Sequence, residues 1–341
     1  MAHALIEKAS RVQKLTGAEA EEVMEELLSG RVETPEVVRL LVALNKRAYR
    51  AEELAGFART MRRHAAEVFA ADETLPERMV DTCGTGGDDS GTFNISTAAA
   101  IVASAAGARI AKHGNRAASS KCGSADVLEA LGVRIDLPFA QIGRAIREIG
   151  IGFLFAQAAH TAMRHVMPAR REIGVRTVFN LLGPLTNPAK AQAQVLGVFS
   201  AEIVDLVAEA LAELGTEHAL VVHGAGRLDE ISLCGPTLIA EVKAGSVNRY
   251  EVTPEDFGVE PAPLAAVRGG SAAESAALIR AILAGETGPK RDIVVINAAA
   301  ALVTAGAAGS FKKGAQMARE ALDSGAAARK LEEMRRFGAS S

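Results

Sequence analysis

The chain has no excess of basic residues: 38 lysines and arginines stand against 41 acidic residues, which gives a formal net charge of −3. A protein that binds nucleic acid or an anionic membrane through its overall field needs a basic surface. The sequence therefore argues against both kinds of partner. An anionic substrate would have to be held by local groups, because the global charge of the chain does not attract it.

Cysteines and long apolar runs are scarce as well. The three cysteines, Cys83, Cys122 and Cys234, form no CxxC pair, and their odd number indicates a reducing compartment. The first residues show no charged region followed by an apolar stretch, so we expect no secretory signal. Two apolar stretches, 95–108 and 293–308, are shorter than the roughly 18 residues of a membrane span. We expect them to be buried helices and the protein to be cytoplasmic.

The first ~70 residues carry a helical pattern without strands. Thr16 and Glu19 have the spacing of a capping box, in which each side chain bonds the backbone N–H of the other residue. We therefore expect a helix that ends near Gly30. Thr34-Pro35 begins another helix, because proline is well tolerated in the first turn. A third helix is expected from about residue 51 to 69.

From Pro76 onward, short apolar runs alternate with alanine-rich helical stretches. The runs expected to form strands are 79–80, 108–110, 133–135, 151–155, 195–199 and 219–222. Such alternation is typical of an α/β fold with a mainly parallel central sheet covered by helices. The segment from about 240 to 270 has no dominant pattern, and we expect a small peripheral strand or a loop there. With 341 residues, the chain can form one large or two moderate domains.

The first candidate site is the glycine-rich segment 81–88, Asp-Thr-Cys-Gly-Thr-Gly-Gly-Asp, which follows a predicted strand. Because glycine has no Cβ, backbone N–H groups there can approach a phosphate closely. Residues 92–97, Thr-Phe-Asn-Ile-Ser-Thr, then lead into a predicted helix, whose N-terminus favours an anion. Taken alone, a tight turn followed by an ordinary N-cap is the alternative interpretation.

A second segment, residues 112–124, also follows a predicted strand and strengthens the first interpretation. It contains two lysines, an arginine, three serines and two glycines. A solvated basic loop is the alternative, but such a loop does not need glycine and serine between its cations. Anion binding does, because backbone donors and hydroxyl groups then share the contacts with the charged side chains.

A third segment has the opposite charge. Asp229 and Glu230 follow the apolar run 219–222 and a glycine-containing turn. Mg²⁺ accepts one or two carboxylates and completes its shell with water and phosphate oxygens. An exposed acidic turn is the more common origin of an isolated Asp-Glu pair. The two anion-binding segments nevertheless favour a metal site here.

In this order, the motifs resemble those of one family. Gly-Thr-Gly-Gly-Asp (84–88), Asn-Ile-Ser-Thr (94–97), Lys-His-Gly-Asn-Arg (112–116) and Asp-Glu (229–230), with segments 163–174 and 176–188, are similar to the anthranilate phosphoribosyltransferases. The resemblance implies a Mg²⁺-dependent pentosyltransferase. It would transfer the phosphoribosyl group of 5-phosphoribosyl 1-diphosphate to the amine of anthranilate, giving N-(5-phosphoribosyl)anthranilate and diphosphate. That reaction is the second step of tryptophan biosynthesis from chorismate.

The resemblance also implies the domain organisation and the assembly. A small helical domain would span residues 1–72, with a returning helical piece near 167–185. A larger α/β domain of the nucleoside phosphorylase and phosphoribosyltransferase class would span residues 73–341. The family implies a homodimer formed through the helical domain. We expect the same from Val37, Leu41 and Leu44, which would leave more apolar surface than one small helical layer can bury.

Site residues follow from the matching motif positions. The resemblance implies that 5-phosphoribosyl 1-diphosphate is bound by Gly84, Gly87, Asp88, Thr92, Asn94, Ile95, Ser96, Thr97, Lys112, His113, Gly114, Asn115, Arg116, Ala117, Ala118, Ser119, Ser120 and Ser124. Anthranilate would contact Gly84, Asn115 and Arg170, with Arg170 facing its carboxylate. Two Mg²⁺ ions are implied, one at Ser96 and a second at Asp229 and Glu230.

The chain departs from the family pattern at Gln157 and Thr161, where proline often stands, and at Cys122, where serine often stands. The first two positions precede Arg170 and concern the aromatic pocket. We assign no general base, and for His113 we favour a role in bracing its loop. The alternative function is that of a pyrimidine nucleoside phosphorylase. A non-catalytic nucleic-acid-binding relative is disfavoured by the charge and by the complete phosphate motifs.

Overall fold

In the computed structural model, which describes residues 2–117 and 121–339, the chain begins with four helices. They are α1 (Ala2–Ser10), α2 (Gly17–Leu28), α3 (Thr34–Leu44) and α4 (Ala51–Arg63). The predicted capping box is present, since Thr16 and Glu19 bond each other's backbone N–H, and Pro35 lies in the first turn of α3. The helix expected to reach residue 69 ends at Arg63. Val68 and Phe69 prolong the apolar pattern, but they pack from an irregular segment against α7 (Phe139–Glu148).

A seven-stranded sheet forms the centre of the remaining chain, in the order β3-β2-β1-β4-β5-β6-β7. The strands are β1 (Met79–Gly84), β2 (Arg109–Gly114), β3 (Ile151–Phe155), β4 (Ala193–Gly197), β5 (His218–Gly224), β6 (Thr237–Lys243) and β7 (Ser246–Val252). From β3 to β5 all neighbouring strands are parallel, whereas β6 and β7 form an antiparallel hairpin at one edge. The prediction of an α/β fold with a mainly parallel sheet is confirmed.

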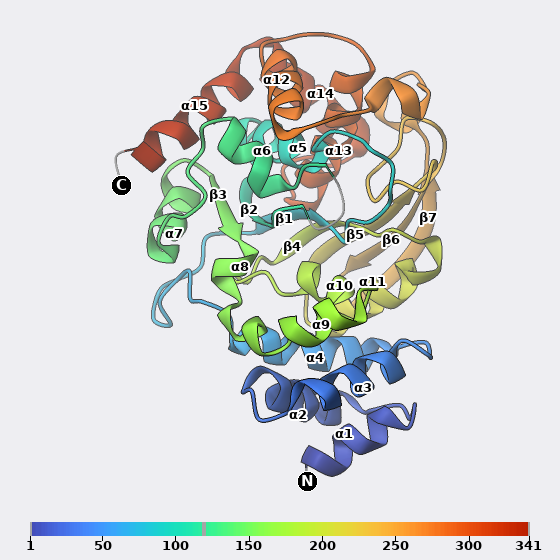
Figure 1. Ribbon diagram of the computed structural model, residues 1–341. Coiled ribbons are helices and arrows are strands. Elements are labelled where there is room, and N and C mark those ends of the chain that lie inside the picture. Colours follow the sequence, from blue (N-terminus) through green and yellow to red (C-terminus); the bar gives the residue numbers. More distant parts are fainter. Residues whose placement is uncertain (1, 118–120, 340–341) are drawn as a thin grey trace.

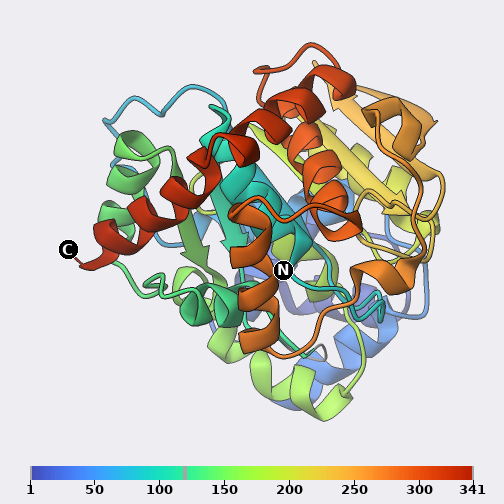
Figure 2. The same ribbon diagram turned by 90° about the horizontal axis from the view of Figure 1, so that it is seen from above.

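Helices cover both faces of the sheet (Figure 1). One face carries α5 (Ile95–Ala105), α6 (Ser124–Ala130), α12 (Ala272–Leu283), α13 (Pro289–Thr304), α14 (Phe311–Asp323) and α15 (Ala326–Ala339). The other face carries α4, α10 (Phe179–Leu182) and α11 (Val204–Glu213), while α7 (Phe139–Glu148) packs beside β3. Neighbouring residues of β5 serve both layers: Leu220 and Val222 point to the first, and Val221 to the second. Viewed from above, the C-terminal helices extend across the molecule (Figure 2).

Two expectations about strands are tested by this topology. Residues 133–135 form no strand, although Val133 and Ile135 are buried in the core. They lie in the connection between α6 and α7, so their burial reflects packing against helices without any ladder of hydrogen bonds. The segment without a clear pattern, 240–270, contains most of the β6–β7 hairpin followed by short 3₁₀ turns. The expectation of a small peripheral strand is confirmed there.

The first helices share their core with a later segment of the chain. Two short helices, α8 (Ala156–Ala159) and α9 (Met167–Ile173), flank a 3₁₀ turn, and α10 follows before a second 3₁₀ turn at Gly183–Leu185. Apolar side chains of α9 and α10 lie in one cluster with those of α2, α3 and α4. In Figure 1 these short helices lie between the N-terminal helices and the sheet. The N-terminal helices therefore do not bury their apolar faces among themselves alone.

The apolar residues expected to face a second subunit are instead buried within the chain. Val37, Leu41 and Leu44 are at most 1% exposed, because they pack in the core that α3 shares with α1 and α9. The argument for a dimer from these three residues is therefore wrong. The alanine-rich stretches form buried helices α5 and α13, as expected. Among the described residues, no helix is both long and apolar enough to span a bilayer.

Candidate active site

Three loops meet at the carboxyl edge of the parallel strands. They follow β1, β2 and β5, and they contain the three motif segments predicted to form the site. Gly86 N donates a hydrogen bond of 2.8 Å to Asp229 Oδ2, and Ser96 N donates one of 3.1 Å to Glu230 Oε1. Carboxyl edges of parallel sheets are where α/β proteins bind ligands. The acidic pair and the first glycine-rich loop, about 140 residues apart in sequence, are therefore direct neighbours.

At two positions of the first loop, the structure requires glycine. A Cβ on Gly84 would overlap with Asp229 Oδ2, so only glycine lets the acidic turn approach the end of β1. Gly87 has a φ of +75°, a left-handed conformation that glycine adopts without strain. Asp88 Oδ1 accepts a hydrogen bond of 3.2 Å from Ser90 N, and its other oxygen accepts one of 3.4 Å from Asp229 N. The loop is therefore held by the acids as well as by its own turns.

The two acids have pKa values far from those of free carboxyl groups. Burial, followed by the charge of Asp88, raises the pKa of Asp229 to about 7. Burial and the charge of Asp229 raise the pKa of Glu230 to about 8. Two closely spaced carboxylates in a poorly hydrated site repel each other, and Lys112 opposes the shift of Glu230 only in part. A divalent cation would stabilise the charged form of both acids. The oxygen donors fit Mg²⁺, although among the described residues no group of three or more His, Cys, Asp or Glu side chains is arranged to hold a metal.

Beneath these loops lies a buried polar cluster that the sequence motifs include only in part. Lys112 is 3% exposed; its Nζ donates to the carbonyl of Thr82 and, over 3.2 Å, to Ser96 Oγ. Burial lowers the pKa of Lys112, and Asp81 opposes that shift. Asp81 itself is fully buried, accepts from His113 N at 2.9 Å, and has its pKa raised by burial to about 6. Asp81 begins the candidate segment 81–88, but the sequence assigned no role to this side chain.

His113 is buried and does not face the loops as an open base. Its ring packs edge-on against that of His160, with 5.2 Å between centroids. Burial, with the neighbouring His160, lowers the pKa of His113 to about 3, and burial lowers that of His160 to about 4. Both rings are therefore neutral near pH 7. This geometry supports the expected bracing role of His113.

The side chains of residues 92–97, at the start of α5, divide into two groups. Ile95 and Thr97 point into the core, at 1% exposure each, so Ile95 offers a ligand only backbone groups. Thr92 and Asn94 are half-buried beside the loop: Thr92 Oγ1 lies 3.2 Å from Ser90 Oγ, and Asn94 Nδ2 donates to Cys122 O at 3.2 Å. The buried Asn94 Oδ1 has no hydrogen-bond partner among the described residues. The structure thus brings polar groups of this turn to the edge of the second loop.

The second loop is tied to the start of α6. Asn115 N donates to Ser124 Oγ at 3.1 Å, and Gly114 is so close to Ser124 that a Cβ would overlap with its hydroxyl. The Arg116 guanidinium pairs with Asp126 at 3.0 Å and with Glu129, and lies over the Phe155 ring. Ala117 N donates to Asp126 Oδ2. The predicted ligands Ala118, Ser119 and Ser120 lie outside the described residues.

Arg170 is a half-buried cation with aromatic and sulfur neighbours. It lies on α9, with its Cζ 5.5 Å from the Phe179 ring centroid and Nη1 3.9 Å from Met167 Sδ. Within residues 2–117 and 121–339, no carboxylate lies within ion-pair distance of it, Glu172 included. Partial burial lowers its pKa. A half-buried arginine without an acidic partner is suited to an anionic ligand.

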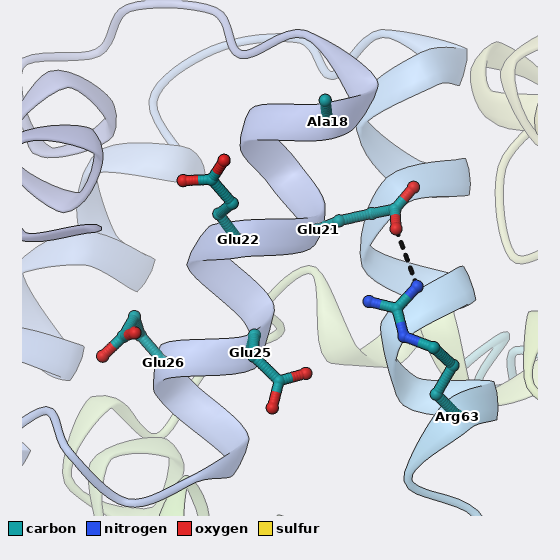
Figure 3. A pocket seen from close by; sticks show the side chains of 6 residues that line it. All are labelled: Ala18, Glu21, Glu22, Glu25, Glu26 and Arg63. Carbon is teal, nitrogen blue, oxygen red and sulfur yellow. Dashed lines mark hydrogen bonds and ion pairs between the residues drawn. The ribbon is translucent and has the colours of Figure 1, made fainter. Parts of the chain in front are cut away.

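A surface hollow of about 390 Å³ lies elsewhere, between α2 and α4 (Figure 3). Four glutamates line it, Glu21, Glu22, Glu25 and Glu26, and Arg63 pairs with Glu21 at 2.7 Å. Its charge repels a phosphate, and it carries none of the predicted site residues. The candidate site therefore remains the carboxyl edge of the sheet, where the predicted residues gather.

Comparisons with known proteins agree with this placement. The model described as "Glycosyl transferase family, a/b domain" matches residues 76–328, and that described as "Glycosyl transferase family, helical bundle domain" matches residues 3–65. An anthranilate phosphoribosyltransferase of Symbiobacterium thermophilum is 48% identical over 98% of this chain and 97% of its own length. One of Chloroflexus aggregans is 53% identical over 94% of this chain and 93% of its own length.

Solved structures give the same result. The crystal structure of anthranilate phosphoribosyltransferase from Thermus thermophilus matches with a TM-score of 0.93 at 48% identity, covering 99% of this chain and 100% of that one. The enzyme from Saccharomyces cerevisiae in complex with PRPP and Mg matches with a TM-score of 0.88 at 29% identity, covering 100% and 99%. The chain belongs to this glycosyl transferase family and, within it, to the anthranilate phosphoribosyltransferases.

Proposed function

We propose that the chain transfers the phosphoribosyl group of 5-phosphoribosyl 1-diphosphate to the amine of anthranilate, releasing diphosphate, as a step of tryptophan biosynthesis. The observation that carries this is the meeting of two glycine-rich loops and an acidic turn at one edge of the sheet. Relatives about 50% identical over nearly the whole chain carry the same activity in their names. A pyrimidine nucleoside phosphorylase is not favoured.

One assay tests the substrate. Purified protein is mixed with anthranilate, 5-phosphoribosyl 1-diphosphate and Mg²⁺, and the loss of anthranilate fluorescence is followed. Transfer should be fast and should stop when either substrate or Mg²⁺ is left out. A preparation that leaves anthranilate unchanged and phosphorolyses thymidine or uridine would establish the nucleoside phosphorylase instead.

The loops supply the phosphate contacts in this proposal. The N–H groups of Gly87 and Asp88, with the hydroxyl of Thr92, bind the diphosphate, because Thr85 N and Gly86 N already donate to Gly197 O and Asp229 Oδ2. In the second loop the N–H groups of Asn115 to Ala117 already donate to side chains, so we propose side-chain contacts to phosphate from that loop. Ala118, Ser119 and Ser120 would complete the second loop. Lys112 acts from beneath, because its ammonium lies 3.2 Å from Ser96 Oγ and adds positive potential to the same turn. Neutralising the charge that builds on the leaving diphosphate lowers the barrier to its departure.

Ser96, Asp229 and Glu230 would hold Mg²⁺, and we propose two ions. Mg²⁺ prefers oxygen ligands and shares its shell with phosphate oxygens. The bound ions would neutralise charge on the diphosphate. The fit rests on the raised pKa values of both acids and on the position of Ser96 beside Lys112 and Glu230. The yeast relative is described as bound to PRPP and Mg.

Gly84, Asn115 and Arg170 would bind anthranilate, with the guanidinium of Arg170 facing the carboxylate. The amine of anthranilate is largely neutral near pH 7, so it needs orientation more than deprotonation. We therefore assign no general base. The transition state at the ribose C1 would be oxocarbenium-like, as in other displacements at an anomeric carbon.

The assembly, location and domain division are part of the same proposal. We infer a homodimer through the N-terminal helices, a cytoplasmic enzyme, and a boundary near residue 72 with a returning piece near 167–185. Val42 on α3 and Val175 after α9 are 38% and 67% exposed, and α3 packs on α9. These two valines replace Val37, Leu41 and Leu44 as the apolar residues open to a partner.

A further inference from the structure

The first glycine-rich loop is contacted by the segment that follows α9. Arg176 Nη2 donates a hydrogen bond to the carbonyl oxygen of Gly87. Arg176 follows α9, the helix that carries Arg170, so the contact joins the anthranilate side of the site to the diphosphate loop. A Cβ on Gly87 would lie 2.8 Å from this Arg176 nitrogen, so glycine there also makes room for the arginine.

Both the guanidinium and the backbone of Arg176 are held by neighbouring residues. Its Cζ lies 4.4 Å from the ring centroid of Phe199, a stacking that orients the planar guanidinium. Its own carbonyl accepts a hydrogen bond of 2.6 Å from Asn45 Nδ2, and Asn45 is the C-cap residue of α3. Tyr49 OH in turn donates to Asn45 Oδ1 at 3.1 Å. A continuous set of contacts therefore runs from the helical part, through Arg176, to the loop.

The acidic turn holds the loop at Gly86 and Asp88, and Arg176 adds a contact at Gly87 between them. Gly86, Gly87, Asp89 and Gly91 all have positive φ, and for Asp89, at φ +55°, this conformation is strained. A Cβ added at Gly86 or Gly91 would have no atom within 4 Å, so the loop is open at these two residues. An open loop in a conformation of low intrinsic population needs external contacts to stay in one shape.

We propose that Arg176 is a positioning residue that holds loop 85–91 in the shape that binds diphosphate. This inference rests on the proposed function, because it assigns the loop to 5-phosphoribosyl 1-diphosphate. Arg176 acts through the Gly87 carbonyl and does not itself need to contact a substrate. Asn45 is its support, since it fixes the backbone from which the arginine extends.

Steady-state kinetics and amide hydrogen exchange test the role together. In Arg176→Met, the KM for 5-phosphoribosyl 1-diphosphate should rise roughly tenfold or more, the scale of a lost hydrogen bond to a charged group, while the KM for anthranilate changes less. Arg176→Lys keeps a donor and should recover part of the loss. Asn45→Ala should act in the same direction, and the double variant should fall short of the product of the single effects.

The matched control is Arg144→Met. Arg144 is another exposed arginine over a phenylalanine, 5.8 Å from the Phe337 centroid, on α7 away from the loop. It should leave both KM values unchanged. In the substrate-free protein, amides of 85–91 should exchange several times faster in Arg176→Met than in the wild type or in Arg144→Met.

Equal exchange of 85–91 in all three proteins, or a lower melting temperature of Arg176→Met with both KM values unchanged, would overturn the inference. The exchange measurement needs no substrate, so it separates this inference from the proposed function. If the wild type fails to consume anthranilate, the proposed function fails, while faster exchange of 85–91 in Arg176→Met would still place Arg176 as the support of the loop.

Discussion

At the scale of single residues, the proposed role of Arg170 is to select the acceptor substrate. Its neighbours are an aromatic ring and a thioether, neither of which neutralises its charge. A planar guanidinium can make two parallel hydrogen bonds to a carboxylate, which an ammonium cannot. The absence of an acidic partner within the described chain also removes the alternative that Arg170 only pairs with Glu172 to hold its helix.

Arg170→Ala should therefore raise the KM for anthranilate by an amount worth roughly 1.5–3 kcal/mol, the range for a hydrogen bond to a charged group. The KM for 5-phosphoribosyl 1-diphosphate should change far less, and Arg170→Lys should fall between the two. Arg171→Ala, which removes an exposed arginine from the same helix, is the control. Equal damage to both KM values, or a lower melting temperature with both values intact, would leave the anthranilate role without support.

Motifs predicted which residues gather at the site better than they predicted where side chains point. The loops, Asp229, Glu230 and Ser96 meet as expected. In contrast, Ile95 and Thr97 point into the core, and Arg116 is engaged by two acids. A sequence pattern gives the order of residues along a loop, but the direction of each side chain depends on the packing of α5 and α6 beneath it. For the same reason Arg176, although inside a recognised motif, received no role.

At the scale of elements, the acidic turn after β5 and the N-terminus of α5 form one unit. Asp229→Asn with Glu230→Gln should lower activity strongly and weaken its dependence on Mg²⁺, because the proposed ligands lose their charge. The rise in melting temperature on adding Mg²⁺ with diphosphate should also shrink. Glu21→Gln with Glu22→Gln, another adjacent acidic pair, is the control (Figure 3). An unchanged Mg²⁺ titration in the first double variant would contradict the assignment.

The contact between β2 and the segment after α8 predicts a sensitivity to acid. His113 and His160 have pKa values lowered to about 3 and about 4, below the value near 6.5 of the unfolded chain. Between about pH 6.5 and pH 4 the unfolded chain binds a proton at each histidine that the folded chain excludes. Their contribution to the free energy of unfolding is therefore highest above about pH 6.5 and falls progressively as the pH drops toward 4.

Raised carboxyl pKa values act in the opposite sense, so a difference between variants isolates the histidine. From pH 7 to 5, the wild type should lose about 1–2 kcal/mol more unfolding free energy than His160→Asn, as one buried histidine implies. Denaturant titrations at both pH values measure this. Parallel losses in the two proteins would show that His160 is protonated as readily in the folded state as in the unfolded one.

Local periodicity predicted elements well where one face of an element decides its burial. Helices α2 and α3 and strands β1 to β5 appear close to their expected positions. It failed where burial comes from irregular backbone. Residues 133–135 and 68–69 are apolar and buried without belonging to a strand or helix, because they fill gaps between elements that only the tertiary structure defines.

At the scale of the whole molecule, the proposed dimer can be tested on its exposed valines. Light scattering at micromolar protein should give twice the chain mass. Val175→Asp, at a position 67% exposed, should shift the mass toward the monomer without unfolding the chain, because a buried charge at an interface is costly. Val247→Asp, on the edge strand β7, is the control. A monomeric wild type would refute the dimer, and an unchanged mass in Val175→Asp would place the interface elsewhere.

The core that α2, α3 and α4 share with α9, α10 and α11 has a consequence for the order in which the chain folds. During synthesis the N-terminal helices emerge long before residues 166–211, which complete their apolar environment. Until then Leu40, Leu41 and Phe57 lack part of the apolar side chains that surround them in the folded chain. Packing of these helices therefore depends on contacts of large sequence separation, which slow folding. A fragment of residues 1–72 should accordingly unfold at low denaturant and without a sharp transition, as circular dichroism would show, whereas the full chain unfolds cooperatively.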